Sequence, residues 1–307
     1  MSLFLKLKRL YKTYFPKALI ERRFQKQEKV IYGNIHNAVL SYLEDCERKN
    51  TLKDDQKEVL SFLKTNFITA IPYHYATKYN NEKIPVHYDG SKKLHYTLID
   101  NKRLYWNPEM TPYDIERAMR ALNIEQDPQS PHRYLTGDFT VDKGSVFVDV
   151  GAAEGNLSLQ VIESVKKVYL IEANPTWRRA LEATFEPWKE KVVIITKYAS
   201  NKVAENEINV DSIFEKEKKI DFIKIDVEGH EDKVINGALN TIKNSPELKM
   251  ALCTYHKQHD AEKFAEVLKN LGFNISFTDG YMLFFYDIAA QEPPYLRKGL
   301  IRAVKKH

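Results

Sequence analysis

Cysteine is scarce in this chain of 307 residues, which contains Cys46 and Cys253 and no other thiol. The two lie far apart and lack the spacing of metal ligands, so we expect no disulfide framework and a reducing, cytoplasmic compartment. Long apolar runs are also missing. No segment is long enough to span a bilayer, and lysines interrupt every apolar core that a signal peptide would need. A hydrophobic content of 43% without repeats or low-complexity segments predicts a globular protein with a full core.

Acidic residues are few at the N-terminus. Residues 1–33 contain nine Lys or Arg side chains against Glu21 and Glu28. Leucines recur at helical intervals in this segment, which predicts a basic amphipathic helix. Such a helix either binds the anionic inner face of a membrane or packs on its own domain, and the sequence leaves both options open. A second basic group near the C-terminus has the same two options and comprises Arg297, Lys298, Arg302, Lys305 and Lys306.

Local signals predict helices and a β-hairpin in residues 1–125. Apolar spacing over 34–64, broken by a polar stretch, predicts a helical hairpin. Alternating aromatic and polar residues over 94–106 predict a β-hairpin that turns at Asp100-Asn101. Pro112 after Thr111 is typical of the first turn of a helix, which we expect over 111–122.

A glycine turn follows the first buried strand of the next region, but it lacks the G-x-G-x-x-G spacing of a dinucleotide-binding turn. Residues 146–150 form a short, β-branched, apolar run, which predicts a strand buried in a parallel sheet. The run leads through Asp149-x-Gly151-x-Ala153-x-Gly155 into a helical pattern. This matches the acid-x-Gly-x-Gly-x-Gly turn of S-adenosylmethionine (SAM) methyltransferases, with alanine at the middle glycine. The turn is therefore expected at a helix N-terminus, where backbone can approach a ligand.

An acid ends the second buried strand. Residues 167–171 lead into Glu172, which lies 17 positions after Gly155. A carboxylate there can accept both ribose hydroxyls, and the dinucleotide fold uses an acid at about this spacing in the same way. The structural alternative for Glu172 is a helix N-cap. The cofactor-binding residues expected in this half of the domain are Asp149, Gly151, Ala152, Glu154, Gly155, Asn156, Glu172, Ala173 and Asn174.

Later strands also end in polar groups. The strand over 192–196 leads to Tyr198, Ala199 and Ser200, which should face the adenine edge because ligands collect at the carboxyl ends of parallel strands. The strand over 220–226 ends at Asp226 and continues into Glu228, His230 and Glu231. Three acids and a histidine at one strand end are costly to bury without partners, so they predict a functional site. Asp226 is the last cofactor-binding candidate.

Two β-type runs, 272–277 and 281–286, joined at Asp279-Gly280, predict a terminal hairpin. A parallel α/β sheet that ends in a hairpin contains one antiparallel strand, an arrangement more typical of SAM methyltransferases than of nicotinamide enzymes. The predicted fold is therefore α/β, with a Rossmann-like, mostly parallel sheet and a terminal antiparallel hairpin in residues 126–290. An N-terminal helical and β-hairpin region, 1–125, precedes it, and a basic tail, 291–307, follows it.

The motifs at residues 149–155, 172–175 and 221–231 together resemble the FkbM family of SAM-dependent methyltransferases. The resemblance covers about residues 130–286, and the stretch Lys224-Ile-Asp-Val-Glu-Gly is its most specific part. It implies O-methylation of a hydroxyl, often on a natural product or on a sugar of a surface glycan, with SAM as the methyl donor. We expect the N-terminal region to shape the choice of this acceptor.

The fifth strand of the predicted sheet ends in Thr254-Tyr255-His256, where FkbM methyltransferases commonly carry an acid. A neutral hydroxyl needs a base to become a nucleophile, and His256, with an ordinary pKa of about 6.5, is our candidate. Asp226 and Glu228 would position the acceptor or the SAM amine. His132 and Arg133, in a proline-bounded loop, are candidates to meet an anionic group. Tyr255 is a further candidate for acceptor binding.

Other interpretations remain open. Asp226, Glu228, His230 and His256 could together hold a divalent cation that activates the hydroxyl. An NAD(P)-dependent sugar-modifying enzyme would share the acid at Glu172, and a non-catalytic binding module at the membrane could use the same fold. Nucleic acid is not an expected partner, because the basic residues gather at the termini without interleaved aromatic side chains. A small molecule or a glycan is the expected acceptor.

Overall fold

The computed structural model of the chain describes residues 17–80, 83–287 and 291–305. These residues fall into two compact units. The first contains the described residues of 1–86, 110–131 and 279–298, and the second those of 87–109, 132–278 and 299–307. The first half of the predicted basic helix, residues 1–16, lies outside the described residues. No described helix is both long and apolar enough to cross a membrane.

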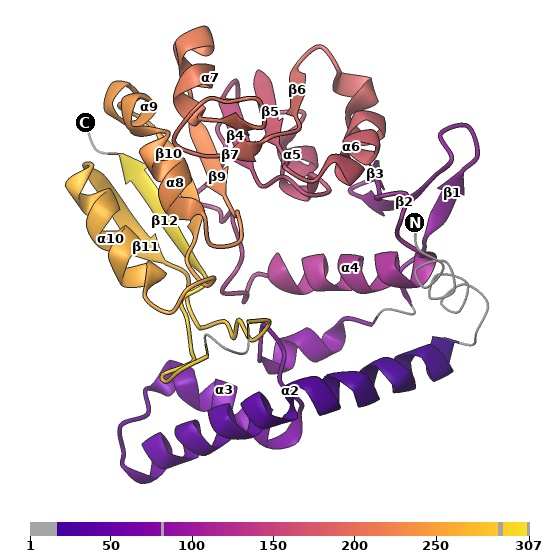
Figure 1. Cartoon of the computed structure of the whole chain (residues 1–307), viewed down its shortest axis with the longest axis vertical. Helices are drawn as coiled ribbons and strands as arrows, with labels where there is room; N and C mark the ends of the chain where they lie inside the picture. The colour runs from indigo at the N-terminus through magenta and orange to yellow at the C-terminus, as the bar shows by residue number, and fades with distance from the viewer. Residues whose placement is uncertain (1–16, 81–82, 288–290, 306–307) are drawn as a thin grey trace. The chain divides into compact units, whose positions relative to one another are not determined.

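The first unit is helical (Figure 1). It contains α2 (Lys17–Arg48), α3 (Asp54–Thr65), the 3₁₀ helix η1 (His74–Lys78) and α4 (Pro112–Glu125). The predicted helical hairpin is confirmed as α2 and α3, with Val39 and Leu63 among its buried apolar side chains. The predicted start of α4 is also confirmed. Thr111 Oγ1 accepts from the backbone N–H of Asp114 at 3.3 Å, which satisfies a free donor of the first turn.

The second unit is built on a seven-stranded sheet with the order β11-β12-β10-β9-β4-β5-β6. Its strands are β4 (Val146–Val150), β5 (Lys167–Ile171), β6 (Val192–Ile195), β9 (Phe222–Ile225), β10 (Lys249–Cys253), β11 (Phe273–Phe277) and β12 (Leu300–Lys305). From β6 to β10 all neighbours are parallel, whereas β12 runs antiparallel to both of its neighbours. The predicted α/β fold with a mostly parallel sheet is therefore confirmed.

Short helices connect these strands. They are α5 (Asn156–Val161), η3 (Pro175–Trp177), α6 (Arg178–Phe185), η4 (Glu186–Trp188), α7 (Val210–Glu217), α8 (Glu231–Asn236), α9 (Leu239–Asn244) and α10 (Asp260–Asn270). The two-residue strands β7 (Tyr198–Ala199) and β8 (Glu207–Ile208) pair with each other. Because β4 is flanked by β5 on one side and β9 on the other, the chain reverses its direction of sheet growth there, and ligands of such folds bind at the carboxyl ends beside this point.

The predicted β-hairpin of residues 94–106 is confirmed as β2 (Leu94–Ile99) and β3 (Lys102–Tyr105), joined at Asp100-Asn101, whose φ angles are both positive. With β1 (His87–Asp89) it forms a three-stranded sheet. This sheet belongs to the second unit and not to the helical first unit, which differs from the predicted N-terminal region. The backbone N–H of Tyr105 donates to Thr184 Oγ1 at 2.9 Å, which ties the hairpin to α6.

The predicted terminal hairpin is wrong in its second strand. Segment 281–286 lies in the first unit, where Tyr281 N–H donates to the hydroxyl of Tyr73 at 2.7 Å. The antiparallel partner of β11 is β12, which lies within the segment predicted to be a basic tail. Its basic side chains are partnered: Arg302 donates to backbone oxygens of residues 133 and 134, and Lys305 donates to the carbonyl of Ile242 in the last turn of α9. The segment predicted to be a tail thus supplies a strand of the sheet, and its basic residues Arg302 and Lys305 pack on their own domain, one of the two options that the sequence left open.

Side-chain alternation gives the sheet two different faces. Val148, Ile223 and Leu252 join one apolar cluster with side chains of α7, α8, α9 and α10. Alternate residues of these strands point to the opposite face, and they include Asp149, Lys224 and Cys253. Polar side chains are thus brought together under the carboxyl ends of β4, β9 and β10.

Candidate active site

The glycine turn, residues 151–155, connects β4 to α5. Gly151 has φ +78°, and a Cβ there would lie 1.9 Å from the backbone oxygen of Asp226. Gly155 has φ +81°, and a Cβ there would lie 2.8 Å from the ring of Phe185. Both glycines are therefore required by backbone conformation and by close approach. Ala153, at the middle glycine of the motif, also has a positive φ of 46°.

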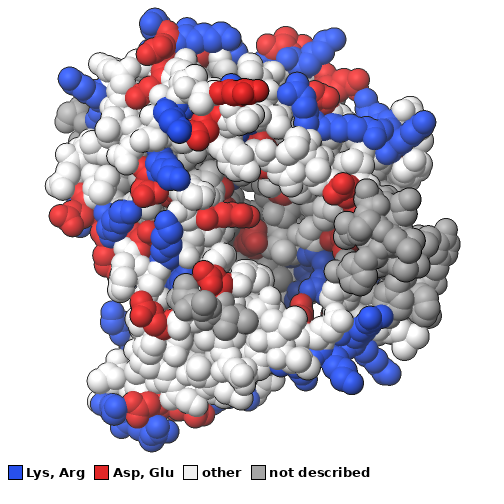
Figure 2. Space-filling view, viewed as in Figure 1, with Lys and Arg blue, Asp and Glu red and all other residues white. Residues whose placement is uncertain are grey.

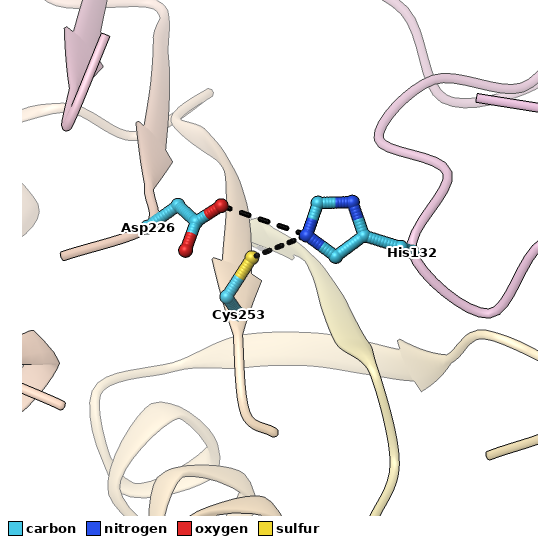
Figure 3. A group of neighbouring side chains, drawn as sticks. All are labelled: His132, Asp226 and Cys253. Atoms are coloured by element: carbon cyan, nitrogen blue, oxygen red, sulfur yellow. Dashed lines mark hydrogen bonds and ion pairs between the residues drawn. The ribbon is translucent and has the colours of Figure 1, made fainter. Parts of the chain in front are cut away.

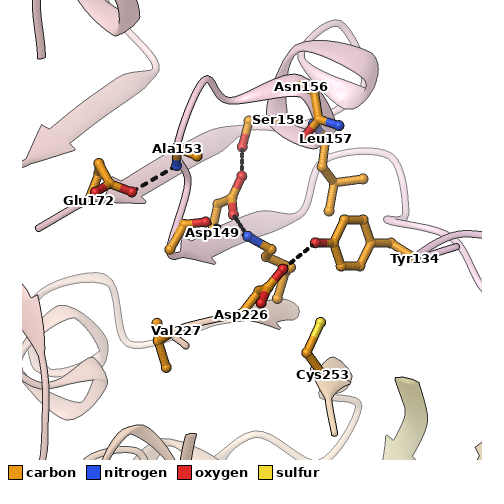
Figure 4. A network of polar contacts seen from close by, with 12 residues as sticks. Tyr134, Asp149, Ala153, Asn156, Leu157, Ser158, Glu172, Asp226, Val227 and Cys253 are labelled. Atoms are coloured by element: carbon orange, nitrogen blue, oxygen red, sulfur yellow. Dashed lines mark hydrogen bonds and ion pairs between the residues drawn. The ribbon is translucent and has the colours of Figure 1, made fainter. Parts of the chain in front are cut away.

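The carboxylate of Asp149 faces inward and holds the turn. Its Oδ2 accepts from Ser158 Oγ at 2.7 Å, and its Oδ1 lies 3.2 Å from Lys224 Nζ (Figure 4). Lys224 Nζ also donates to the backbone oxygen of Gly151 at 2.5 Å. Asp149 and Lys224 are direct neighbours in the β4–β9 register, which explains the pairing. The structure thus engages Asp149, a predicted cofactor residue, with two side chains beneath the turn.

Glu172 connects the glycine turn to the loop after β5. Its Oε2 accepts from the backbone N–H of Ala153 at 2.9 Å (Figure 4). Its Oε1 accepts from the backbone N–H of Asn174 at 2.7 Å. Glu172 is half-buried. A carboxylate has about four acceptor positions, so each oxygen of Glu172 can accept one further hydrogen bond. The side chain of Asn174 caps η3 by accepting from Thr176 N–H at 3.0 Å.

The remaining cofactor candidates are divided between the turn and β7. Ala152 and Glu154 are buried in the turn, and Asn156 is the first residue of α5. Ala173 is half-buried between Glu172 and Asn174. At β7, Tyr198 is exposed and Ala199 half-buried, whereas Ser200 is buried and donates to Glu207 Oε2 at 3.0 Å. Ser200 is thus occupied by contacts within its own loop.

Asp226 is the centre of a polar group at the end of β9, called here the Asp226 cluster: His132, Tyr134, Asp226, Tyr255 and His256. The Tyr134 hydroxyl donates to Asp226 Oδ2 at 2.8 Å, and that of Tyr255 to Oδ1 at 3.3 Å. The Nε2 atoms of His132 and His256 each lie 3.5 Å from a different oxygen of the same carboxylate. The side chain of Asp226 is 18% exposed while both imidazoles are almost fully buried, so solvent reaches the cluster at the carboxylate.

A buried carboxylate orients His256. Glu231, the first residue of α8, is fully buried, and its Oε1 lies 2.9 Å from His256 Nδ1. The same oxygen accepts from the backbone N–H groups of Val227 and Gly229 at 3.1 and 3.3 Å. The carboxylate is therefore held by the backbone, and with Nδ1 directed to Glu231, His256 turns Nε2 toward Asp226. This is the geometry of a histidine base with a fixed tautomer.

Charges in and beside the cluster shift the pKa values of its titrating groups. Burial lowers the pKa of His256, but Glu231 and Asp226 outweigh burial and hold this pKa above its ordinary value of 6.5. Burial raises the pKa of Asp226, but His132 and the Lys224 ammonium outweigh it and hold the carboxyl well below its usual range. The pKa of Lys224 is lowered by burial and raised more strongly by Asp149 and Asp226, so the lysine stays charged.

A family profile described as the methyltransferase FkbM domain matches residues 122–275, half of the chain. The chain belongs to the FkbM methyltransferase family. It is thus a member of a family of enzymes that transfer methyl groups, as the motifs predicted. No curated protein sequence matches the chain.

Two solved structures similar to this FkbM family member illustrate the fold. An FkbM methyltransferase of Methylobacillus flagellatus KT is 16% identical with a TM-score of 0.43, and the alignment covers 63% of this chain and 53% of that one. The chain thus spans about half the length of that relative. Magnesium protoporphyrin IX methyltransferase of Synechocystis PCC 6803, solved with bound SAM, is 15% identical with a TM-score of 0.40, and the alignment covers 62% and 84% of the two chains.

Some predicted site residues of this FkbM methyltransferase do not join the cluster. Glu228 and His230 are exposed on the turn after β9. The predicted metal set is therefore not assembled: the described residues contain two groups with metal-ligating geometry, and neither includes Glu228 or His230. Arg133 Nε donates to the carbonyl of Leu135 at 2.7 Å, so its side chain binds its own loop.

The structure adds three residues that were not candidates, Tyr134, Lys224 and Cys253, and it pairs Glu231, predicted only as one of the acids after β9, with His256. Lys224 is the first residue of the Lys-Ile-Asp-Val-Glu-Gly motif and Glu231 lies two positions after its last residue. Their charges, on a buried strand and at a helix start, were a usable signal. Cys253 lies at the end of β10, with Sγ 3.6 Å from His132 Nε2 (Figure 3). Tyr134 and Cys253 carried no sequence signal, because their role depends on a long-range contact.

Proposed function

We propose that this FkbM methyltransferase transfers a methyl group from SAM to a hydroxyl of a sugar, glycan or related natural product. The observation that carries the proposal is the Glu231–His256 pair, which directs His256 Nε2 toward Asp226 at the carboxyl ends of β9 and β10. A base is needed for a hydroxyl acceptor, because a neutral hydroxyl is a weak nucleophile.

The cofactor end of the site fits SAM. The glycine turn brings backbone close to the carboxyl end of β4, and each oxygen of Glu172 has room for one more donor, as two ribose hydroxyls would supply. Bound SAM would supply an electrophilic methyl group on a sulfonium. The SAM-bound neighbour of similar fold is in keeping with this cofactor.

At the acceptor end, the residues of the chain would handle the proton. The acceptor hydroxyl would lie at His256 Nε2, which takes its proton as the O–CH₃ bond forms and the S–CH₃ bond breaks. Glu231 stabilises the imidazolium that results, and Asp226 positions the acceptor or the amine of the donor. The products are the methyl ether, S-adenosylhomocysteine and a protonated His256, which releases its proton to solvent.

The test of the cofactor is calorimetric titration with SAM, S-adenosylhomocysteine and NAD⁺. We expect SAM to bind and Glu172→Ala to weaken it at least ~10-fold, because two charge-assisted hydrogen bonds are lost. Glu266→Ala, on the exposed face of α10, is the matched control and should bind as the wild type does. Tighter binding of NAD⁺ than of SAM would favour the nicotinamide alternative. Loss of all nucleotide binding would favour a non-catalytic module.

The acceptor class is tested with SAM carrying a radioactive methyl group and a panel of free sugars and lipid-linked glycans. We expect label in a product that survives mild alkali, since a methyl ether is stable there and a methyl ester is hydrolysed. Alkali-labile label would contradict a hydroxyl acceptor. On the face that Figure 2 shows, basic and acidic side chains of the described residues are interspersed. This is unlike the continuous basic surface of nucleic-acid binding proteins and supports a glycan or small-molecule acceptor.

We also propose that α2 attaches the enzyme to an anionic membrane surface. The two acids in the first half of this helix face α4 within the first unit: Glu28 pairs with Arg117 at 3.0 Å, and Glu21 accepts from the Tyr113 hydroxyl. Arg22, Lys26 and Lys29 are exposed and form no ion pair among the described residues. Exposed apolar side chains lie beside them, with Val30 80% and Ile31 54% exposed. An outward face of this composition suits anionic lipid.

Vesicle sedimentation tests this attachment. We expect binding to phosphatidylserine-containing vesicles and none to pure phosphatidylcholine. Replacing Arg22, Lys26 and Lys29 by Gln should weaken binding roughly 100-fold, since each basic residue contributes ~1 kcal/mol at an anionic surface. The matched control replaces Lys233, Lys243 and Lys269, exposed lysines of the second unit, by Gln. Equal loss in the two triple variants would mean that net charge and not this face determines binding.

A further inference from the structure

Three side chains of the second unit converge on one point beside the proposed base. His132 Nε2 lies 3.5 Å from Asp226 Oδ2 and 3.6 Å from Cys253 Sγ (Figure 3). One ligand-type atom from each residue lies within 4.8 Å of the other two. The imidazole comes from the loop before β4, the carboxylate from the end of β9 and the thiol from the end of β10. Three separate segments therefore supply nitrogen, oxygen and sulfur to a common centre.

The distance from His132 to Asp226 is long for a hydrogen bond, whereas the distance from His132 to Cys253 is within the hydrogen-bond range for sulfur, and both suit the edges of a coordination polyhedron. Nitrogen and oxygen atoms 3.5 Å apart exceed the usual hydrogen-bond range. Ligands at 2.0 to 2.3 Å from a tetrahedral Zn²⁺ are about 3.3 to 3.6 Å from each other. The two distances of His132 match these edges.

We propose that His132 Nε2, Asp226 Oδ2 and Cys253 Sγ form a binding site for a divalent cation that accepts both imidazole and thiolate, with Zn²⁺ as the best match. A mixed nitrogen, oxygen and sulfur set disfavours Mg²⁺ and Ca²⁺, which prefer oxygen ligands. Binding would release the thiol proton of Cys253 to solvent, and two anionic ligands would then balance the charge of the ion.

A second group of side chains with metal-ligating geometry is better explained without an ion. It consists of Asp226, Glu231 and His256. His256 Nδ1 lies 2.9 Å from Glu231 Oε1, a hydrogen-bond distance, and that oxygen already accepts from two backbone N–H groups. The two groups thus have different roles on the two sides of the Asp226 carboxylate. His256 approaches Oδ1, and the proposed metal site uses Oδ2.

Around the proposed ion, the chain supplies the supporting contacts that metal ligands usually have. Tyr134 donates to Asp226 Oδ2 at 2.8 Å, which fixes the orientation of the carboxylate. Arg302 of β12 donates to the backbone oxygen of Arg133 at 2.6 Å and so holds the loop that carries His132. Three protein ligands leave a fourth position open, as in catalytic zinc sites.

The use of that open position rests on the proposed function. An acceptor hydroxyl bound there would become more acidic, and its proton would pass to His256 Nε2 on the other side of Asp226. The ion would thus act on the same hydroxyl as the base, while the methyl donor and the leaving thioether remain as described above. The metal site itself does not depend on this role and can be tested without SAM or an acceptor.

The test uses the untagged, full-length protein after treatment with a chelator, titrated with Co²⁺ in the absence of oxygen. Thiolate bound to Co²⁺ gives an intense charge-transfer absorption in the near ultraviolet. We expect this band to saturate at one equivalent and to disappear when Zn²⁺ is added. Cys253→Ser should abolish the band, and Cys46→Ser, which replaces the other cysteine of the chain, should leave it unchanged.

A second variant guards against loss of folding. In His132→Gln the thiolate remains, so the band should persist while Co²⁺ binds at least tenfold more weakly; circular dichroism checks that each variant is folded. Absence of a thiolate band in the folded wild-type protein, or a band that survives in folded Cys253→Ser, would overturn the proposal. SAM binding to the same sample separates the two proposals. A band without SAM binding would contradict only the proposed function, and SAM binding without a band only the metal site.

Discussion

The glycine turn is held mainly by backbone contacts, whereas the Asp226 cluster is held by side chains. Gly151, Ala153 and Glu172 lie within 22 consecutive residues, and what they share is close backbone approach or backbone hydrogen bonds. The Asp226 cluster draws its members from segments more than 120 residues apart, which meet only through the sheet and the loop before β4. The local sequence motif therefore determines the conformation of the glycine turn, whereas tertiary packing determines the arrangement of the Asp226 cluster.

This difference predicts how each region fails. The turn tolerates changes of side chain but not of backbone space, as alanine at its middle position shows. The Asp226 cluster should instead lose function when a single polar atom is removed, because its side chains all contact one carboxylate. The experiments below separate loss of chemistry from loss of structure.

The largest expected effect is on chemistry. His256→Ala should lower kcat by ~10²- to 10⁴-fold, the range for removal of a general base, while SAM affinity stays within a factor of two or so. Steady-state rates and calorimetric SAM titration on the same preparation measure both quantities. His259→Ala, an exposed histidine at the start of α10, is the matched control and should keep full activity. A variant at His256 that retained near wild-type turnover would remove this residue from the proposed mechanism.

A second, smaller effect is expected on stability. Gly151→Ala should destabilise the protein by about 3 kcal/mol, because its Cβ would overlap the backbone oxygen of Asp226 and its φ is positive. Thermal unfolding of Gly151→Ala and Gly137→Ala checks this, since a Cβ at Gly137 would meet no atom within 4 Å. Similar unfolding midpoints for the two variants would show that the turn has more room than its close approach to Asp226 implies.

The smallest effect concerns the hydroxyls around Asp226. Tyr134→Phe removes a donor at 2.8 Å and should lower kcat/KM roughly fivefold, equivalent to ~1 kcal/mol. Tyr255→Phe removes a donor at 3.3 Å, a weaker contact, and should cost less. Parallel kinetics of the two variants rank them directly. If Tyr255→Phe proved the more damaging, its hydroxyl would contact the acceptor rather than only support the carboxylate.

The sequence predicted the local structure of the glycine turn and Glu172 well and the Asp226 cluster in part, and the binding roles of these residues stay predictions. Gly151, Gly155 and Glu172 are readable because a strand, a tight turn and an acid at fixed spacing are local features. His256 and Asp226 were predicted from their positions at strand ends, and the structure places them together. Glu228 was predicted from its neighbourhood in the motif, but a positive φ of 52° places it on an exposed turn. Adjacency in sequence did not mean adjacency in space.

The tail of the chain gives the clearest failure. Arg302 and Lys305 belong to a strand between β10 and β11, where their charges are satisfied by carbonyl oxygens. A sequence pattern cannot show that a distant loop or helix end will supply those oxygens. The same contact explains why the role of His132 was only partly predicted and that of Tyr134 was missed, since Arg302 holds the loop that brings them to Asp226.

By itself, the sequence determined the parallel strands, the glycine turn and the methyltransferase family, because periodicity, glycine placement and motif spacing act over a few residues. Only the tertiary structure decided which carboxylate orients His256, which strand completes the sheet and that Cys253 faces His132. Those outcomes depend on register between strands and on which side chain satisfies which buried polar group. They are properties of packing, and they arise only when segments distant in the chain meet.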